Sequence, residues 1–393
     1  MRPARKLLAL TLLAALAAVP VEAQTLHLER AVLLIRHGVR PPTHEPALDP
    51  AVAPSAWPSW EVPDGYLTPH GGAAISLLAA YDRVLLAPLA TGKCPDVSIY
   101  TDVDERTEKT GTAYAQGFAP GCAVTVGHAS GITDPLFSPL DVPAPNFDAK
   151  AAKHEMQAAA GGDVNTPVQA HLALFQAMQS VLAPGQTSYL DLPAKVSAKI
   201  PGRVPKLSGP IAEGSSAAEV FLLEYLDGKP MDQVAWGRAD AAQISALLAL
   251  HPLAYTITAR PEMIARATAT KLADRILANL QHGPAVSVLV GHDTNQAELG
   301  GLLDLHWSPP GYPADDPPPG SGLLFSLLAD AAGQQYVTVT YQVQSMAQIR
   351  GLQILDAKNK PELQALPIPG CGNSTAATAC TLQNFVRLVQ SAP

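Results

Sequence analysis

The sequence lacks three features that define common functional classes. It contains no HExxH element and no cluster of paired Cys and His residues, so it has no recognisable metal-binding motif. It has no excess of basic residues, because 26 Lys and Arg stand against 34 Asp and Glu. Its N-terminal apolar run is shorter than the roughly 20 residues that a membrane span requires. We therefore expect no metal or other cofactor, no nucleic-acid partner and no membrane anchor.

Residues 1–23 carry the pattern of an export signal. Arg2, Arg5 and Lys6 precede the apolar segment "LLALTLLAALAA", and small residues ending at Ala23 complete a cleavage site. Removal of this segment changes the net charge from −8 to −10, since three basic residues and one acidic residue are lost. The pattern predicts a periplasmic or secreted protein, which we expect to be a monomer. An anionic ligand must then be held by a local concentration of positive charge.

The chain contains only four cysteines. Disulfides persist in an exported protein, and four cysteines allow three pairings. Cys371 and Cys380 bracket a small polar loop, whereas Cys94 and Cys122 flank one strand-plus-helix unit. Spacing therefore favours the pairs Cys94–Cys122 and Cys371–Cys380.

Units of strand, turn and helix recur along the chain. Segment 28–38 is a short apolar run ended by Gly38, and segment 67–89 is typical of a helix with Thr68 as its N-cap and Pro69 at its first position. A strand at 96–104 precedes a helix at 105–118, and 285–303 repeats the strand–turn–helix theme. This order predicts the α/β class, with a mostly parallel sheet flanked by helices.

The middle of the chain, residues 147–279, is Ala- and Leu-rich and helical in pattern. A helix with a Ser cap is expected over 215–228, and another is expected from Pro261 to Gly283. We therefore expect an α/β domain made of residues 24–146 and 280–393, with a smaller α-helical domain, residues 147–279, inserted into it. The Pro-rich segment 308–322 is expected to be a surface loop, and 335–344 a late alternating strand.

Three polar clusters follow three of the expected strands: "RHGVR", "DER" and "GHDTN". Ligands of open α/β sheets bind outside the carboxyl ends of the strands, so these clusters can converge. Together they would supply three guanidiniums, two imidazoles and one carboxylate, from Arg36, Arg40, Arg106, His37, His292 and Asp293. Three guanidiniums match and neutralise the oxygens of a phosphoryl group.

The cluster also predicts chemistry. Arginines beside His37 lower its pKa and favour the neutral imidazole, which is a nucleophile. Asp293 can protonate a leaving oxygen as a general acid. Each motif alone has a simpler explanation, such as a surface ion pair of Arg106 or a helix cap at "HD". Only the joint pattern at successive strand ends favours a metal-free phosphoryl-transfer site.

On these motifs the sequence resembles the histidine acid phosphatases, and more closely their bacterial periplasmic phytase-type members. "RHGVRPPT" is similar to the family's active-site heptad with its following threonine, and "GHDTNQAELGGLLDLHW" to its third block. "YTDVDERTEKTGTAYAQGFAPGC" and "DPLFSPL" resemble the second block. "EVFLLEY" and "WGR" are also similar, so the resemblance covers most of the chain.

The resemblance implies a role for each site residue. His37 would become phosphorylated, and Asp293 would donate the proton. The phosphate and the rest of the substrate would be bound by Arg36, Arg40, Thr43, Arg106, His292 and Glu219. Glu219 matches a position that faces substrate in phytase-type members, although an ordinary glutamate on a helix face is an equal alternative.

The sequence departs from the family in two ways. Family phytases usually carry more cysteines, so only the two disulfides above can be matched. His44 follows Thr43 where close relatives often have lysine, which replaces a permanent charge by one present mainly at acidic pH. The other histidines are expected in the core or on the surface without a role in the site: His27, His70, His128, His154, His171, His251, His282 and His306.

The favoured interpretation is an acid phosphomonoesterase acting on a small-molecule phosphate monoester, with phytate (inositol hexakisphosphate) as the preferred substrate. A sugar-phosphate phosphatase, of the glucose 1-phosphate type, or a broad acid phosphatase of the same family is the alternative; such relatives often have serine where this chain has Thr294. A mutase-like role shares "RHG", but the export signal and "HDTN" oppose it. A non-catalytic phosphate-ester-binding protein would have no need of Asp293.

Overall fold

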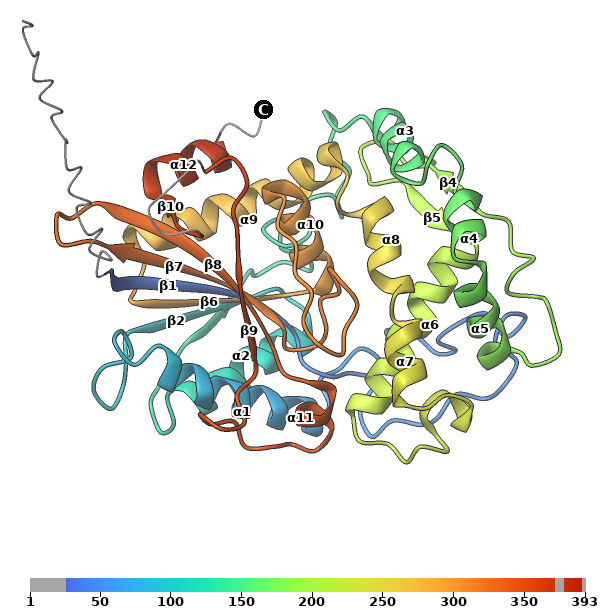
Figure 1. The fold of residues 1–393 in the computed structure, drawn as a ribbon, viewed down its shortest axis with the longest axis horizontal. Coiled ribbons are helices and arrows are strands. Elements are labelled where there is room, and N and C mark those ends of the chain that lie inside the picture. Colours follow the sequence, from blue (N-terminus) through green and yellow to red (C-terminus); the bar gives the residue numbers. More distant parts are fainter. Residues whose placement is uncertain (1–25, 372–377, 391–393) are drawn as a thin grey trace, which may run out of the picture.

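The computed structural model of the protein describes residues 26–371 and 378–390 (Figure 1). The expected export signal, residues 1–23, lies outside the described residues. Within the described ranges, no helix is both long and apolar enough to cross a membrane.

One eight-stranded sheet organises the larger part of the molecule (Figure 1). Its strands are β1 (His27–Arg36), β2 (Val97–Thr101), β3 (Val126–His128), β6 (Val286–Gly291), β7 (Gly322–Ala329), β8 (Gln335–Val343), β9 (Glu362–Leu366) and β10 (Cys380–Thr381). Their order is β10-β8-β7-β1-β6-β2-β3, with β9 paired to β8. The four strands β1, β6, β2 and β3 pair in parallel, and β7 to β10 extend the sheet in antiparallel fashion.

Helices cover both faces of the sheet (Figure 1). One face carries α1 (Pro69–Leu85) and α2 (Glu105–Phe118), and the other carries α9 (Glu262–His282) and α10 (Asp293–Leu303). Side chains of β1 alternate between two cores, with Leu33 in the core that includes α1 and α2 and Leu34 in the core that extends into the helical part. Two short helices, α11 (Met346–Arg350) and α12 (Leu382–Gln390), complete this part. The predicted α/β class is confirmed.

The second part of the molecule is mainly helical and lies beyond the carboxyl ends of the parallel strands (Figure 1). It consists of α3 (Ala149–Ala159), α4 (Asn165–Ala170), α5 (Leu172–Leu182), the hairpin β4 (Lys195–Ser197) and β5 (Lys206–Ser208), α6 (Pro210–Leu226), the 3-10 turn η1 (Val234–Gly237), α7 (Ala241–Leu247) and α8 (Leu250–Thr258). Helix α9 contacts β1, β7 and α10 in the sheet layers. We therefore propose that the boundary of the helical part lies near residue 261 rather than at 279.

Local signals explain most helix boundaries. Thr68 caps α1, and its hydroxyl accepts a hydrogen bond from the Gly71 N–H, as the sequence predicts. The expected Ser cap of the helix at 215–228 is wrong, because α6 already begins at Pro210 after Gly209. Gly209 has a φ of 101°, which suits glycine, and proline favours the first helical turn.

The Pro-rich segment 308–322 is only partly a surface loop. Its second half, residues 316–321, is buried, which corrects the expectation for this half. The backbone carbonyl of Pro317 accepts a hydrogen bond from Arg36 at 2.7 Å, and that of Asp316 accepts one from Trp307 Nε1 at 2.7 Å. Buried partners for its backbone carbonyls hold this half of the segment inside the molecule.

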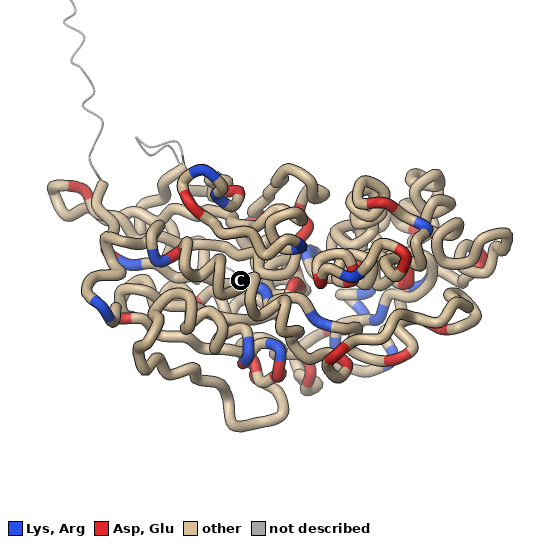
Figure 2. The backbone as a smooth tube through the Cα atoms, turned by 90° about the horizontal axis from the view of Figure 1, so that it is seen from below, with Lys and Arg blue, Asp and Glu red and all other residues tan. Residues whose placement is uncertain are grey.

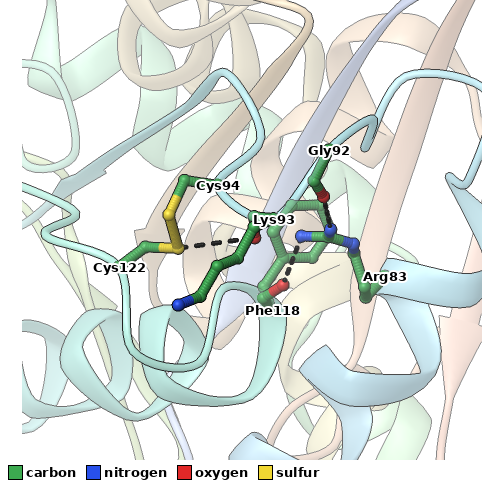
Figure 3. Close-up of a disulfide and its surroundings, with 6 residues drawn as sticks. All are labelled: Arg83, Gly92, Lys93, Cys94, Phe118 and Cys122. Atoms are coloured by element: carbon green, nitrogen blue, oxygen red, sulfur yellow. Dashed lines mark hydrogen bonds between the residues drawn. A yellow bond between two sulfur atoms is a disulfide. The ribbon is translucent and has the colours of Figure 1, made fainter.

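Both expected disulfides are present. Cys94 pairs with Cys122 across 28 residues, and Cys371 pairs with Cys380 across 9. Figure 3 shows the first of them beside Arg83, whose guanidinium donates to the Phe118 and Gly92 carbonyls. The disulfide and Arg83 thus both tie the loop after α1 to the end of α2.

Charged residues are sparse, at 15% of the chain. Figure 2 shows them as short blue and red segments scattered over a mostly tan backbone, in both parts of the molecule. Against this sparse and scattered charge, a cluster of several arginines would stand out from the rest of the molecule.

Candidate active site

Strand register brings the three polar clusters to one edge of the sheet. Arg36 at the end of β1 is aligned with Gly291 at the end of β6, and Thr101 at the end of β2 is aligned with Val290. The N–H of His37 donates to the Gly291 carbonyl at 2.9 Å. Because these strands are parallel, the residues that follow them meet at the same edge.

His37 is buried, with 1% of its surface exposed. Its Nδ1 lies 2.8 Å from the carbonyl oxygen of Gly38, so Nδ1 carries a hydrogen and donates it. Burial, followed by the charges of Arg40, Arg106 and Arg36, lowers its pKa well below the usual value. The imidazole is therefore neutral, with a lone pair on Nε2.

The three expected arginines surround His37, and the charge of each contributes to the lowering of its pKa. Arg36 is fully buried and donates to the Pro317 carbonyl. Arg106, in the first turn of α2, pairs with Asp104 at 2.8 Å. Burial lowers the pKa of Arg40 to about 10, which leaves it charged at neutral and acidic pH.

The Nε–H groups of Arg36, Arg40 and Arg106 are buried and have no hydrogen-bond partner in the described part of the chain. A buried donor without a partner costs about 1–3 kcal/mol. An anion with several oxygen acceptors could satisfy such donors and neutralise the three charges. This arrangement has the chemistry of a phosphate cradle.

His292 is held by an aspartate that the sequence reasoning missed. Its Nε2 lies 2.8 Å from Oδ2 of Asp102, and its Nδ1 lies 3.5 Å from Arg106 Nη2. Asp102 is 3% exposed, so Nε2–H donates to a buried carboxylate that fixes the ring. Asp102 directly follows β2 and stands two residues before the "DER" cluster that contains Arg106, and this position is the signal that could have revealed it.

Asp293 is the first residue of α10, and both of its carboxylate oxygens have partners within the protein. Its Oδ2 lies 2.8 Å from Arg36 Nη2, and its Oδ1 accepts the Thr294 N–H at 2.8 Å. Burial alone would raise its pKa, but the charges of Arg36, His251 and other cations outweigh burial and hold the pKa well below the usual range. Asp293 is therefore ionised.

Glu219 reaches the same guanidinium from α6. Its Oε1 contacts Arg36 Nη2, and its Oε2 lies 3.5 Å from Arg36 Nη1. With 7% of its surface exposed, it is not an ordinary glutamate on a solvated helix face. The helical part therefore contributes directly to the site, while the effect of Glu219 on substrate stays a prediction.

Thr43 and His44 lie in the exposed loop that follows the first cluster. A Cβ atom placed on Gly65 would be 3.7 Å from both Thr43 and Arg106 Nη1, so Thr43 lies close to the cradle. His44 Nδ1 lies 2.9 Å from the Pro46 carbonyl. Thr43 therefore borders the arginines at an exposed position rather than in their buried centre.

His251 lies in the core, as expected, but its position beside the site residues was not predicted. This buried histidine of α8 lies 2.7 Å, through Nδ1, from Oδ1 of Asp316. Its Nε2 is 3.9 Å from both Glu219 Oε2 and Asp293 Oδ2. Tyr255, one turn further along α8, hydrogen-bonds to Asp293. No sequence pattern predicts this contact, since His251 stands alone in an apolar helix and Asp316 lies in the Pro-rich segment.

Two groups of potential metal ligands occur among the described residues: Asp102, Asp104 and His292, and Glu219, His251 and Asp293. A guanidinium already pairs with a carboxylate of each group, namely Arg106 with Asp104 and Arg36 with Asp293. The protein therefore supplies its own cations at both places, and no metal is needed to balance these carboxylates.

Residues 27–342 match the family model of the histidine phosphatase superfamily (branch 2). The chain belongs to this superfamily. It is 35% identical over 404 residues to phytase AppA of Escherichia coli, and this alignment covers 93% of this chain and 92% of the relative. It is 29% identical over 398 residues to the glucose-1-phosphatase of Salmonella typhimurium, covering 95% of each.

Among solved structures, the Hafnia alvei phytase in complex with myo-inositol hexakis sulphate superposes with a TM-score of 0.87 and 32% identity. The match covers 93% of this chain and 97% of that one. Together with the family match, these likenesses identify the protein as a phosphoric monoester hydrolase of the histidine acid phosphatase type.

Proposed function

We propose that this hydrolase transfers the phosphoryl group of its substrate to Nε2 of His37, and that its preferred substrate is an inositol polyphosphate such as phytate. One observation carries the proposal: a neutral, buried imidazole with a free Nε2 stands among three arginines whose buried Nε–H groups lack partners. Such a centre attracts an anion and attacks it without a metal.

The reaction would run in two steps. In the first, His37 Nε2 attacks phosphorus while Arg36, Arg40 and Arg106 neutralise the equatorial oxygens, and Asp293 protonates the leaving oxygen. In the second, water attacks the phosphohistidine, and the Asp293 carboxylate accepts its proton. His292, oriented by Asp102, would bind the transferred group.

The first step requires Asp293 to be protonated. Asp293 must gain a proton before it can donate one, yet its pKa is lowered chiefly by Arg36 and His251 against the effect of burial. A bound phosphoryl dianion competes for Arg36 and adds negative charge, so it raises the pKa of Asp293. Substrate binding would thus prepare the general acid.

Phytate is favoured because the relatives include two proteins named as phytases, one of them complexed with the hexasulphate analogue of inositol hexakisphosphate. His44 follows Thr43 in the exposed loop, at a position where close relatives often have lysine, and would add positive charge mainly at acidic pH. We therefore expect phytate hydrolysis to be favoured under acidic conditions. The N-terminal segment supports a periplasmic or secreted location.

The second candidate is a sugar-phosphate phosphatase, which the similarity to glucose-1-phosphatase favours. A panel of phytate, glucose 1-phosphate and nitrophenyl phosphate at acidic pH separates the two. The proposal requires the highest kcat/KM on phytate, whereas a preference for glucose 1-phosphate would favour the second candidate. Binding of all three esters without turnover would indicate a phosphate-ester-binding protein instead.

A further inference from the structure

His251 and Asp316 form a buried pair directly behind Asp293, and the two steps above make no use of it. His251 is 4% exposed and Asp316 is fully buried. Nδ1 of His251 lies 2.7 Å from Oδ1 of Asp316, while Nε2 faces Asp293 and Glu219. A titratable imidazole between three carboxylates requires an explanation.

The position of Asp316 is fixed by its backbone. Its carbonyl oxygen accepts hydrogen bonds from Trp307 Nε1 at 2.7 Å and Tyr341 Oη at 2.9 Å. Its second carboxylate oxygen, Oδ2, has no hydrogen-bond partner in the described part of the chain. Asp316 therefore holds Nδ1–H of His251 and directs Nε2 toward Asp293.

Three carboxylates around His251 favour its charged form: Asp316 of the Pro-rich loop, Glu219 of α6 and Asp293 of α10. Tyr255 of its own helix and the Arg36 cation of β1 also lie in this cluster, and the positive charge of Arg36 opposes the charged imidazole. Burial lowers the pKa of His251, but the three carboxylates together raise it above the ordinary value. At acidic pH the ring is an imidazolium with an N–H beside Asp293.

We propose that His251 is the proton reservoir of Asp293, and that Asp316 is the residue that positions it. The inference deepens the function proposed above and rests on it. When substrate occupies Arg36, Nε2–H of His251 gives its proton to Asp293 Oδ2, and His251 becomes neutral. Asp293 passes a proton to the leaving oxygen as the P–O bond breaks and the bond from phosphorus to His37 Nε2 forms.

The second step restores the starting state. Water loses a proton to Asp293 as it attacks the phosphohistidine, and Asp293 returns that proton to His251 Nε2. One proton leaves the reservoir and one returns in each cycle, so no exchange with solvent is needed. This balance suits a histidine that is almost completely buried.

Geometry favours Asp293 over Glu219 as the receiver. Glu219 Oε2 and Asp293 Oδ2 are both 3.9 Å from His251 Nε2, but Arg36 holds Glu219 through both carboxylate oxygens and Asp293 through Oδ2 alone. If phosphate draws Arg36 away, Oδ2 loses one partner and keeps the other. The distance of 3.9 Å between His251 Nε2 and Asp293 Oδ2 must shorten by about 1 Å to form a hydrogen bond. Catalytic hydrogen bonds often reach their short length only when substrate is bound.

The test compares single-turnover phosphorylation rates on glycerol 2-phosphate, whose alkoxide leaving group needs a proton, and on nitrophenyl phosphate, whose leaving group does not. In the wild type, the rate on glycerol phosphate should fall as pH rises through the pKa of His251, which gives the pH–rate profile a descending alkaline limb. The profile measured on nitrophenyl phosphate should lack this limb. Asp316→Asn removes the nearest carboxylate, so the limb should move to lower pH. His251→Asn should lose roughly 10²-fold or more on glycerol phosphate and far less on nitrophenyl phosphate.

Tyr255→Phe is the matched control, because it removes another hydrogen bond to Asp293 and keeps the imidazole. It should leave the position of the limb unchanged. Equal losses of His251→Asn on both esters, or an unshifted limb in Asp316→Asn, would overturn the relay. If the variants do not fold, the wild type decides alone, since identical pH limbs for both esters also overturn it. A wild type that hydrolyses neither ester would instead contradict the proposed function.

Discussion

Oδ2 of Asp293 lies 2.8 Å from Nη2 of Arg36, so the expected proton donor and a phosphate-binding cation form an ion pair. This ion pair links binding to catalysis, because the same guanidinium that attracts phosphate also holds Asp293 as a carboxylate. A variant in which residue 293 carries no charge should therefore affect catalysis without weakening phosphate binding.

Asp293→Asn should therefore lower the rate on phytate or glucose 1-phosphate by roughly 10²- to 10⁴-fold. The loss in phosphorylation rate on nitrophenyl phosphate should be far smaller, since nitrophenolate leaves without a proton. Inhibition by inorganic phosphate should persist or tighten, because Arg36 loses a competing anion. Equal losses on both classes of ester, measured by single turnover, would assign Asp293 an orienting role instead.

Stability should depend on pH through Asp82, a fully buried residue of α1. Burial raises its pKa to about 7, against the opposing effect of hydrogen bonds from Gln342 and Tyr114. The folded state therefore binds a proton that the unfolded state releases above about pH 4. This contribution is complete below that pH and is lost as pH rises toward 7.

Chemical denaturation between pH 4 and 7 measures this loss, which we expect to be about 3 kcal/mol. Asp82→Asn should flatten the dependence, because the amide stays neutral and can still accept from Tyr114. Gln342 Oε1 has no partner in the described chain and could accept from the new amide after a flip. An unchanged pH dependence in the variant would exclude Asp82 as its source.

Removal of the two disulfides should have unequal effects. The loops span 28 and 9 residues, so chain entropy predicts losses of about 3.5 and 2.5 kcal/mol respectively. The double variant Cys94→Ser/Cys122→Ser should thus be less stable than Cys371→Ser/Cys380→Ser, as measured by chemical denaturation. The reverse order would show that local packing, rather than loop closure, decides their contributions.

Chelators should leave activity intact, because guanidiniums supply the charge that a divalent metal supplies in many phosphoryl-transfer enzymes. Dialysis against EDTA followed by a substrate assay checks this expectation. Vanadate should inhibit, since it imitates the phosphoryl group in transfer. Activity that is lost on dialysis and restored by a divalent ion would contradict the metal-free mechanism.

Much of the fold and of the cradle could be predicted because each depends on local order along the chain. Apolar runs ended by polar turns mark β1, β2 and β6, and the parallel arrangement then brings the residues after them together. Cysteine spacing sufficed for both disulfides. The start of α6 was missed because Gly209 and Pro210 mark it more strongly than the serines downstream.

The contacts behind the arginines, made by His251, Asp316 and the Pro317 carbonyl, could not be predicted, because no sequence motif or spacing links these residues. His251 and Asp316 are 65 positions apart, and neither lies in a polar cluster. The Pro-rich segment has the composition of a surface loop, yet the Pro317 carbonyl is required by the buried Arg36. Such burial follows from the need to satisfy a guanidinium in the core, which the segment itself does not reveal.

The most direct test of the proposed mechanism is a trapping experiment with a phosphate-labelled substrate. Rapid quenching of the wild type should yield a phosphoenzyme that is labile in acid and stable in base, with the label on the peptide that contains His37. His37→Ala should retain its fold by circular dichroism and give no labelled enzyme. A labelled enzyme that persists in His37→Ala, or a label that is stable in acid, would contradict the assignment of His37 as the nucleophile.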